Sequence, residues 1–143
     1  MAEWISEDAR ARAGLRVLFL QKAIFRTKVI SEKEKEGVKY RDYYDWEEPV
    51  KDAPSHRVLA MRRGEREEIL TLRVIPPEQE AIYLLETFFV KGNGPGSLQV
   101  RQALEDSYRR LLFPSMENEI RLFTKGRADE EAIRVFAENL REL

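Results

Sequence analysis

Cysteine is absent from the chain of 143 residues, and His56 is its single histidine. Without cysteine, neither disulfide bonds nor thiolate metal sites can form. A zinc site with one histidine would need several carboxylates, and no spacing typical of such a ligand set occurs. The acidic run Asp42, Asp45, Glu47 and Glu48 lacks the glycine-turned loop that gathers oxygen ligands around a hard cation. We therefore expect no metal and no cofactor.

The sequence also lacks a long apolar segment. No run approaches the about 20 apolar residues that span a bilayer. The N-terminal stretch MAEWISEDARAR has no apolar core of the kind found in a signal peptide. These two absences predict a cytoplasmic protein without a membrane partner.

An excess of positive charge is missing as well, because 25 lysines and arginines face 26 aspartates and glutamates. The formal net charge of −1 is unlike the strongly basic balance of a dedicated nucleic-acid module. The charges are nevertheless uneven along the chain. Residues 20–41 carry seven basic and three acidic side chains, whereas residues 128–143 carry five acidic and two basic ones. This asymmetry leaves room for a local patch that faces phosphate.

Most apolar side chains recur at helical spacing, and hydrophobic residues make up 43% of a chain that is 36% charged. One stretch differs, because Leu70, Leu72 and Val74 alternate with polar residues, which favours a strand. No turn signal supplies this stretch with an obvious pairing partner. The predicted fold class is mainly α: a bundle-like assembly of several helices with at most one short extended or β segment near residues 67–75.

The clearest interruption is KGNGPGS at residues 91–97, where glycine and proline cluster. We interpret residues 1–143 as a single helical region with a break at 91–97 between two helical halves. The final segment FAENLREL is still in apolar helical register at Leu143, without a cap or a glycine. We therefore expect the chain to be a fragment of a larger multidomain protein.

Aromatic residues gather between Lys39 and Glu65. Exposed rings beside cations can stack single-stranded bases, and Lys39 and Arg41 supply such charge. Rings at helical spacing more often pack between helices. The candidates for interaction or stacking are Tyr40, Tyr43, Tyr44, Trp46 and His56. His56 follows the cap residue Ser55, and a general base would need an oriented nucleophile or carboxylate beside it. We predict no catalytic residue.

Two basic sets are candidates for contact with nucleic acid. The first basic set is Lys22, Arg26, Lys28, Lys39 and Arg41. The second basic set is Arg57, Arg62 and Arg63, followed by Arg66. Arginines at the end of a helix also compensate the helix dipole and pair with nearby acids. Phosphate contact is the alternative, and it would make affinity fall steeply with salt.

The segment EGVKYRDYYDWEEPVKDAPSHRVLAMRRGEREEILTLRV resembles the hallmark region of the Tex family of bacterial transcription-accessory proteins. The motifs are Gly-x-Lys-Tyr-Arg-Asp-Tyr, then Pro-Ser-His-Arg, then a helix end with Arg-Gly-Glu. The resemblance continues through VKGNGPG, YRRLLFPSMENEIR and EEAIRVFAENLREL, and so covers nearly the whole chain.

The resemblance implies an N-terminal helical portion that precedes an RNase H-like domain. Tex proteins also carry helix-hairpin-helix elements and an S1 RNA-binding domain. The implied role is a non-enzymatic scaffold segment of a transcription-accessory, nucleic-acid-binding protein, with secondary RNA or DNA contacts. The alternative is a protein-interaction module that docks onto RNA polymerase or another transcription factor. Neither reading includes a small-molecule substrate.

Overall fold

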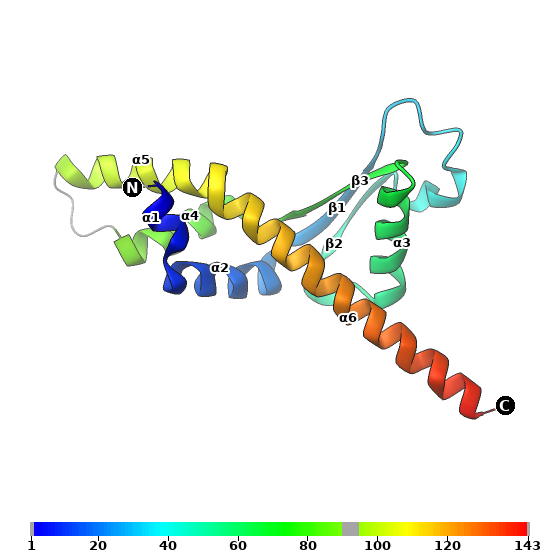
Figure 1. Ribbon diagram of the computed structural model, residues 1–143. Coiled ribbons are helices and arrows are strands. Elements are labelled where there is room, and N and C mark those ends of the chain that lie inside the picture. Colours follow the sequence, from blue (N-terminus) through cyan, green and yellow to red (C-terminus); the bar gives the residue numbers. More distant parts are fainter. Residues whose placement is uncertain (1, 90–94, 143) are drawn as a thin grey trace. The chain divides into compact units, whose positions relative to one another are not determined.

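A computed structural model describes residues 2–89 and 95–142, and Figure 1 shows its helices and strands. The chain divides into two compact units. The first, called the helical unit, comprises residues 1–23 and 75–120, and the second, called the sheet unit, comprises residues 24–74 and 121–143. None of the helices in the described ranges is both long and apolar enough to cross a membrane.

The helical unit contains α1 (Ala2–Glu7), α2 (Ala9–Lys22), α4 (Glu78–Phe89) and α5 (Pro95–Ser107). A π-helical turn at Tyr108–Leu112 joins α5 to the long helix α6 (Phe113–Arg141). Helix α2 begins after Asp8, whose carboxylate accepts hydrogen bonds from the backbone amides of Arg10 and Ala11 at 2.8 and 3.1 Å. Asp8 is therefore the N-cap of α2. Fully buried Leu15, Phe19 and Leu104 belong to the core of this unit.

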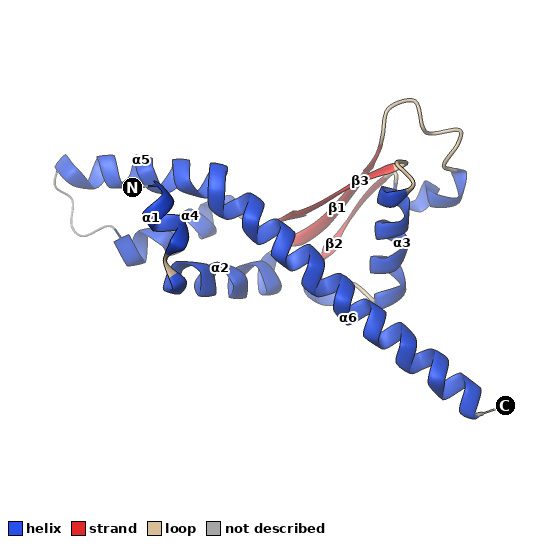
Figure 2. Ribbon diagram, viewed as in Figure 1, coloured by secondary structure: helices blue, strands red, loops and turns tan. Residues whose placement is uncertain are grey.

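The sheet unit contains three strands in the order β2-β1-β3, and Figure 2 shows them in red. They are β1 (Ile24–Val29), β2 (Asp45–Pro49) and β3 (Leu70–Ile75). Strands β1 and β2 pair antiparallel, from Ile24 opposite Pro49 to Lys28 opposite Asp45. Strand β3 is antiparallel to β1, because the Ile30 amide bonds the Ile69 carbonyl and the Thr71 hydroxyl bonds the Lys28 carbonyl.

The prediction of at most one extended segment was therefore wrong, although the protein is mainly helical and the strand near residues 67–75 is confirmed. Strand β1 was missed because its β-branched residues follow directly after a helix in apolar register. Strand β2 was missed because Tyr40, Tyr43 and Trp46 recur at helical spacing. The structure instead forms a 3-10 helix at Val38–Tyr43, and Glu32 before it has φ of 77°, which an α-helix does not allow.

Helix α3 (Ser55–Arg66) buries Val58 and Met61 in the sheet unit. It runs through Gly64, where the sequence predicted its end. A Cβ at Gly64 would lie 2.5 Å from Cδ1 of Leu70, so the glycine permits a close approach of α3 to β3. The chain turns instead at Glu68, which has φ of 63°.

Helix α6 is continuous over 29 residues, although it contains Pro114 and Gly126, two residue types that often interrupt helices. The π-helical turn at Tyr108–Leu112 lies directly before Pro114, and such a local adjustment accommodates the hydrogen bond that proline cannot donate. The predicted break at 91–97 falls largely on residues 91–94, which lie outside the described residues, and α5 already begins at Pro95.

The two faces of the β1–β2 ladder carry different ion pairs, one exposed to water and one largely buried. On the outer face, Arg26 donates to Glu47 at 2.8 Å, and both side chains are well exposed. On the inner face, Glu48 is only 7% exposed and accepts a hydrogen bond from Arg57 at 2.9 Å. The Arg57 guanidinium also lies 5.5 Å from the centre of the Trp46 ring. Arg57 thus neutralises a carboxylate that is almost removed from water.

The first prediction concerns these two arginines. Arg57→Met is expected to lower the free energy of unfolding by about 2 kcal/mol, because it leaves a buried carboxylate without its cation. This is below the about 3–5 kcal/mol of a fully buried pair, since the Arg57 side chain is 40% exposed. Arg26→Met, which breaks an exposed pair to the same strand, is expected to cost less than about 1 kcal/mol.

Urea unfolding followed by circular dichroism measures both values. Adding Glu48→Gln to Arg57→Met should recover part of the loss, because the uncompensated charge is then gone. Equal losses for the two single variants would show that burial of Glu48 has no energetic consequence.

Candidate nucleic-acid interface

The first basic set is largely engaged in ion pairs. Four of its five cations lie within 3.1 Å of a carboxylate: Lys22 with Glu80, Arg26 with Glu47, Lys28 with Asp45, and Lys39 with Glu67. Lys22 belongs to the helical unit and the other four residues to the sheet unit. Arg41 is exposed and has no ion pair within the described part of the chain. Phosphate would have to displace acidic partners at most of these positions.

The candidate stacking residues mostly pack against protein. Tyr40 is 4% exposed, lies in a cluster with Ile69 and Leu70, and donates its hydroxyl hydrogen to Glu67. Tyr43 and Tyr44 pack against the same cluster and are half-buried. Burial raises the pKa of the Tyr43 hydroxyl, and nearby Arg57 opposes this shift.

Trp46 is half-buried and meets the Tyr43 ring edge to face, with ring centres 6.1 Å apart. Arg57 of the second basic set lies over this indole. Arg57 therefore packs on the inner face of the sheet, where it contacts Glu48 and Trp46, and does not share a surface with Arg62 and Arg63.

The rest of the second basic set lines one groove between α3 and α6, which we call the cationic groove. Its volume is about 510 Å³. It is lined by Arg62, Arg63 and Arg66 from α3, by Lys125 and Asp129 from α6, and by His56, Leu59 and Ala60. Sequence reasoning missed Lys125, because it lies about 60 residues from the arginines in the sequence. One signal in the sequence was available: Lys125 follows Arg121 by four residues, which places both cations on one side of a helix.

Positive charge in the cationic groove is only partly neutralised. Asp129, the one acid in its lining, already pairs with Lys125 at 2.6 Å. Arg62 is 3.6 Å from Glu65, and the same carboxylate accepts a hydrogen bond from Arg121. Arg63 and Arg66 are exposed and form no ion pair among the residues that the structure describes.

The pKa of the Arg62 guanidinium is lowered, first by its partial burial and then by the repulsion of Arg121. Like charges therefore crowd together at this groove. Such crowding costs energy in the free protein and is relieved when an anion binds.

His56 is exposed and lies in the cationic groove, but the structure gives it no catalytic companion. The Ser55 hydroxyl donates to Glu131 at 3.0 Å and so is directed toward α6. Across residues 2–89 and 95–142, no group of three or more histidines, cysteines and acids is placed to hold a metal ion.

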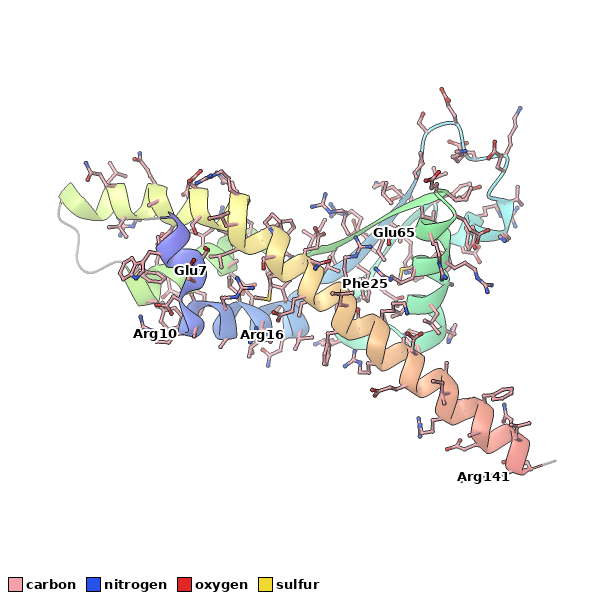
Figure 3. All side chains as sticks on the ribbon, in the orientation of Figure 1. Glu7, Arg10, Arg16, Phe25, Glu65 and Arg141 are labelled. Carbon is pink, nitrogen blue, oxygen red and sulfur yellow. The ribbon has the colours of Figure 1, made fainter. Side chains whose placement is uncertain are left out.

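Arg121 holds α6 to the rest of the sheet unit. It donates to the Leu72 carbonyl of β3 at 3.2 Å and to the Glu65 carboxylate of α3. Figure 3 labels Glu65 on α3 among the side chains that surround it. Three elements therefore meet at one guanidinium, and this contact determines how α6 lies beside α3.

Together, these features describe a mainly helical protein whose sheet unit presents a groove lined by Arg62, Arg63, Arg66 and Lys125. Residues 1–136 match a family model described as Tex central region-like. The chain therefore belongs to the Tex family of transcription-accessory proteins.

Three relatives illustrate the similarity. Protein YdcI of Bacillus subtilis is 44% identical over 73% of this chain and 15% of its own length. The transcriptional accessory protein Tex of Neisseria gonorrhoeae is 35% identical over 100% of this chain and 20% of its own. The S1 RNA-binding domain-containing protein 1 of Pongo abelii is 28% identical over 81% of this chain and 13% of its own. The chain thus spans at most about a fifth of each of these relatives.

The second prediction tests the contact at Arg121. Arg121→Met is expected to lower the free energy of unfolding by about 2 kcal/mol, because hydrogen bonds to charged groups contribute about 1.5–3 kcal/mol. Lys125→Met is the matched control on the same helix, since its pair with Asp129 lies within α6 and should contribute less than about 0.5 kcal/mol. Chemical denaturation of both variants checks the difference, and a larger loss for Lys125→Met would contradict it.

Proposed function

We propose that this chain acts as a non-catalytic scaffold in a Tex-type transcription-accessory protein and that it contacts the phosphate backbone of RNA or DNA through the cationic groove. The main support is the gathering of Arg62, Arg63, Arg66 and Lys125 along one groove with a single, already paired acid. Membership of the Tex family supports the transcriptional context. The name of the Pongo abelii relative records an S1 RNA-binding domain in that protein, which is in keeping with a role at nucleic acid.

Arginine suits this role because its planar guanidinium donates several parallel hydrogen bonds to phosphate oxygens. Arg63 and Arg66 are three residues apart on α3, so both lie on one side of the helix. Contacts of this kind fix the position of a nucleic acid without reading its bases. We therefore expect affinity with little dependence on sequence.

The first basic set and the aromatic candidates have a secondary place in this proposal. Exposed ion pairs contribute only about 0–1 kcal/mol, so phosphate can compete for Lys22, Arg26, Lys28 and Lys39 at modest cost. Arg41 has no carboxylate partner in the described part of the chain, so phosphate would displace none there. Stacking on bases falls to Tyr43, Tyr44 and Trp46, because the Tyr40 ring is buried.

A protein-interaction role is the second candidate, with RNA polymerase or another transcription factor as partner. The observation that favours this role is a second, largely apolar groove, which shares His56 and Leu59 with the cationic groove and is described below.

The third prediction compares two triple variants that remove the same charge. Arg62→Gln, Arg63→Gln and Arg66→Gln together are expected to weaken binding about tenfold or more at low salt. They should also reduce the slope of log affinity against log salt by about 2, since each lost phosphate contact removes about 0.7–0.9. Lys22→Gln, Arg26→Gln and Lys28→Gln together should have a smaller effect, because these cations are already paired.

Fluorescence anisotropy with labelled single-stranded RNA and duplex DNA, at several salt concentrations, gives both quantities. Because both variants lose three cations, net charge alone predicts equal losses. Equal losses, or no loss in the first triple variant, would remove the cationic groove from the proposal.

A further inference from the structure

A second groove in the sheet unit is apolar, and we call it the apolar groove. It has a volume of about 780 Å³ and lies between the start of α3 and the second half of α6. Its apolar lining comprises Ala53, Pro54, Leu59, Ala132, Val135 and Phe136. One wall is α6, and the other is formed by the loop at Ala53 and Pro54 and by the first turns of α3. An amphipathic helix can lie in an apolar groove of this kind.

Large apolar side chains at this groove face water. Phe136 is 65% exposed and Val135 is 44% exposed, and Leu59 is half-buried. A phenylalanine that remains two-thirds exposed beside a groove loses most of the stabilisation that burial would provide. Contiguous exposed apolar surface of this kind marks interaction sites.

The charges around the apolar groove are mainly positive. Lys51 and Arg127 line it, are exposed, and form no ion pair in the described ranges. Glu131 is the one acid in the lining, and it accepts a hydrogen bond from Ser55 and pairs with Arg134 at 3.7 Å. The apolar floor is therefore bordered by two cations whose charge is not balanced locally.

The apolar groove and the cationic groove adjoin. His56 and Leu59 belong to the lining of both, so the apolar surface continues into the surface that carries Arg62, Arg63 and Arg66. A ligand that occupies the apolar groove thus meets positive charge at its border and at one end.

We propose that the apolar groove binds an acidic amphipathic helix of another protein. Apolar side chains spaced i, i+3 or i+4, and i+7 would cover Phe136, Val135 and Leu59, as in other helix-in-groove complexes. Carboxylates beside this stripe would pair with Lys51 and Arg127. Charge complementarity of this type raises the association rate and rejects basic competitors.

A second copy of this chain fits the groove less well. The segment that it would insert is the end of α6, which bears Ile133, Phe136 and Leu140 on its exposed surface. Its acids Asp129, Glu131 and Glu138 are already paired with Lys125 and Arg134. Only Glu130 and Glu142 of this segment form no ion pair among the described residues, and Glu142 lies beyond the last residue of α6, so one carboxylate of the helix remains to complement Lys51 and Arg127.

The fourth prediction uses two fluorescein-labelled synthetic helices as probes. Both carry leucine at i, i+3, i+4 and i+7, and the remaining positions are mostly glutamate in one and lysine in the other. The chain is expected to bind the glutamate helix at least about tenfold more tightly, because only that helix complements Lys51 and Arg127. The combined variant Lys51→Glu and Arg127→Glu should remove this preference.

Phe136→Asp tests the apolar contact, with Leu122→Asp as the matched control. Leu122 is also an exposed residue of α6 but does not line the groove. Phe136→Asp should weaken binding of the glutamate helix about tenfold or more, whereas Leu122→Asp should leave it within about twofold. Because both residues are exposed, neither change should lower stability markedly, and circular dichroism checks this point.

Three results would overturn the proposal. Equal affinity for the two helices would show that charge does not select the occupant. A dimer in sedimentation analysis that Phe136→Asp dissociates would identify a second copy as the occupant. Loss of single-stranded RNA binding in Phe136→Asp, with peptide binding unchanged, would assign the groove to nucleic acid.

Discussion

Both candidate grooves depend on how α6 is held beside α3. Arg121 provides the central contact, because its guanidinium joins the Glu65 carboxylate of α3 and the Leu72 carbonyl of β3. The hydrogen bond from Ser55 to Glu131 adds a second contact about three helical turns further along α6. Between and beside these contacts, the side chains of the two helices diverge enough to leave the cationic groove and the apolar groove. Two polar contacts between α3 and α6 thus accompany both grooves.

The sheet places the charged side chains of β1 and β2 on two different faces. Because side chains alternate across a strand, Arg26 and Lys28 face outward opposite Glu47 and Asp45, whereas Glu48 faces inward. The outward cations are balanced by carboxylates of the neighbouring strand. Among the residues that the structure describes, Arg63 and Arg66 of α3 have no carboxylate partner, so their charge is not balanced by an ion pair. A net charge of −1 thus coexists with a local excess of positive charge.

Much of the helical part of the fold could be predicted from the sequence, but the sheet could not. Helix α4 and strand β3 follow from local signals: the proline pair before Glu78, and the alternation of Leu70, Leu72 and Val74. Helix α3 was expected after a cap at Ser55, but its cap residue is Pro54, and the Ser55 hydroxyl donates to Glu131 instead. Strands β1 and β2 depend on each other across about 20 residues, and no local pattern reports such a pairing. Tyr40 illustrates the difficulty, since its helical spacing to Tyr43 is fulfilled by a 3-10 helix and not by an α-helix.

The candidate site could be predicted in part. The clustering of Arg62, Arg63 and Arg66 is local, because residues of one helix that are three or four apart are neighbours. The contribution of Lys125 and the whole of the apolar groove needed the fold, since both arise where α6 meets α3. Likewise, the pairing of Lys22, Arg26 and Lys28 with distant acids could not be read from their basic neighbourhood in the sequence.

Gly126 lies between Lys125, which lines the cationic groove, and Arg127, which lines the apolar groove. A Cβ at this position would meet nothing within 4 Å, so packing does not require glycine here. An interior glycine weakens a helix by about 1 kcal/mol relative to alanine. The last four turns of α6 are thus joined to the preceding part by a compliant link. An alanine in its place would stiffen this part of α6 and leave the lining of both grooves as it is.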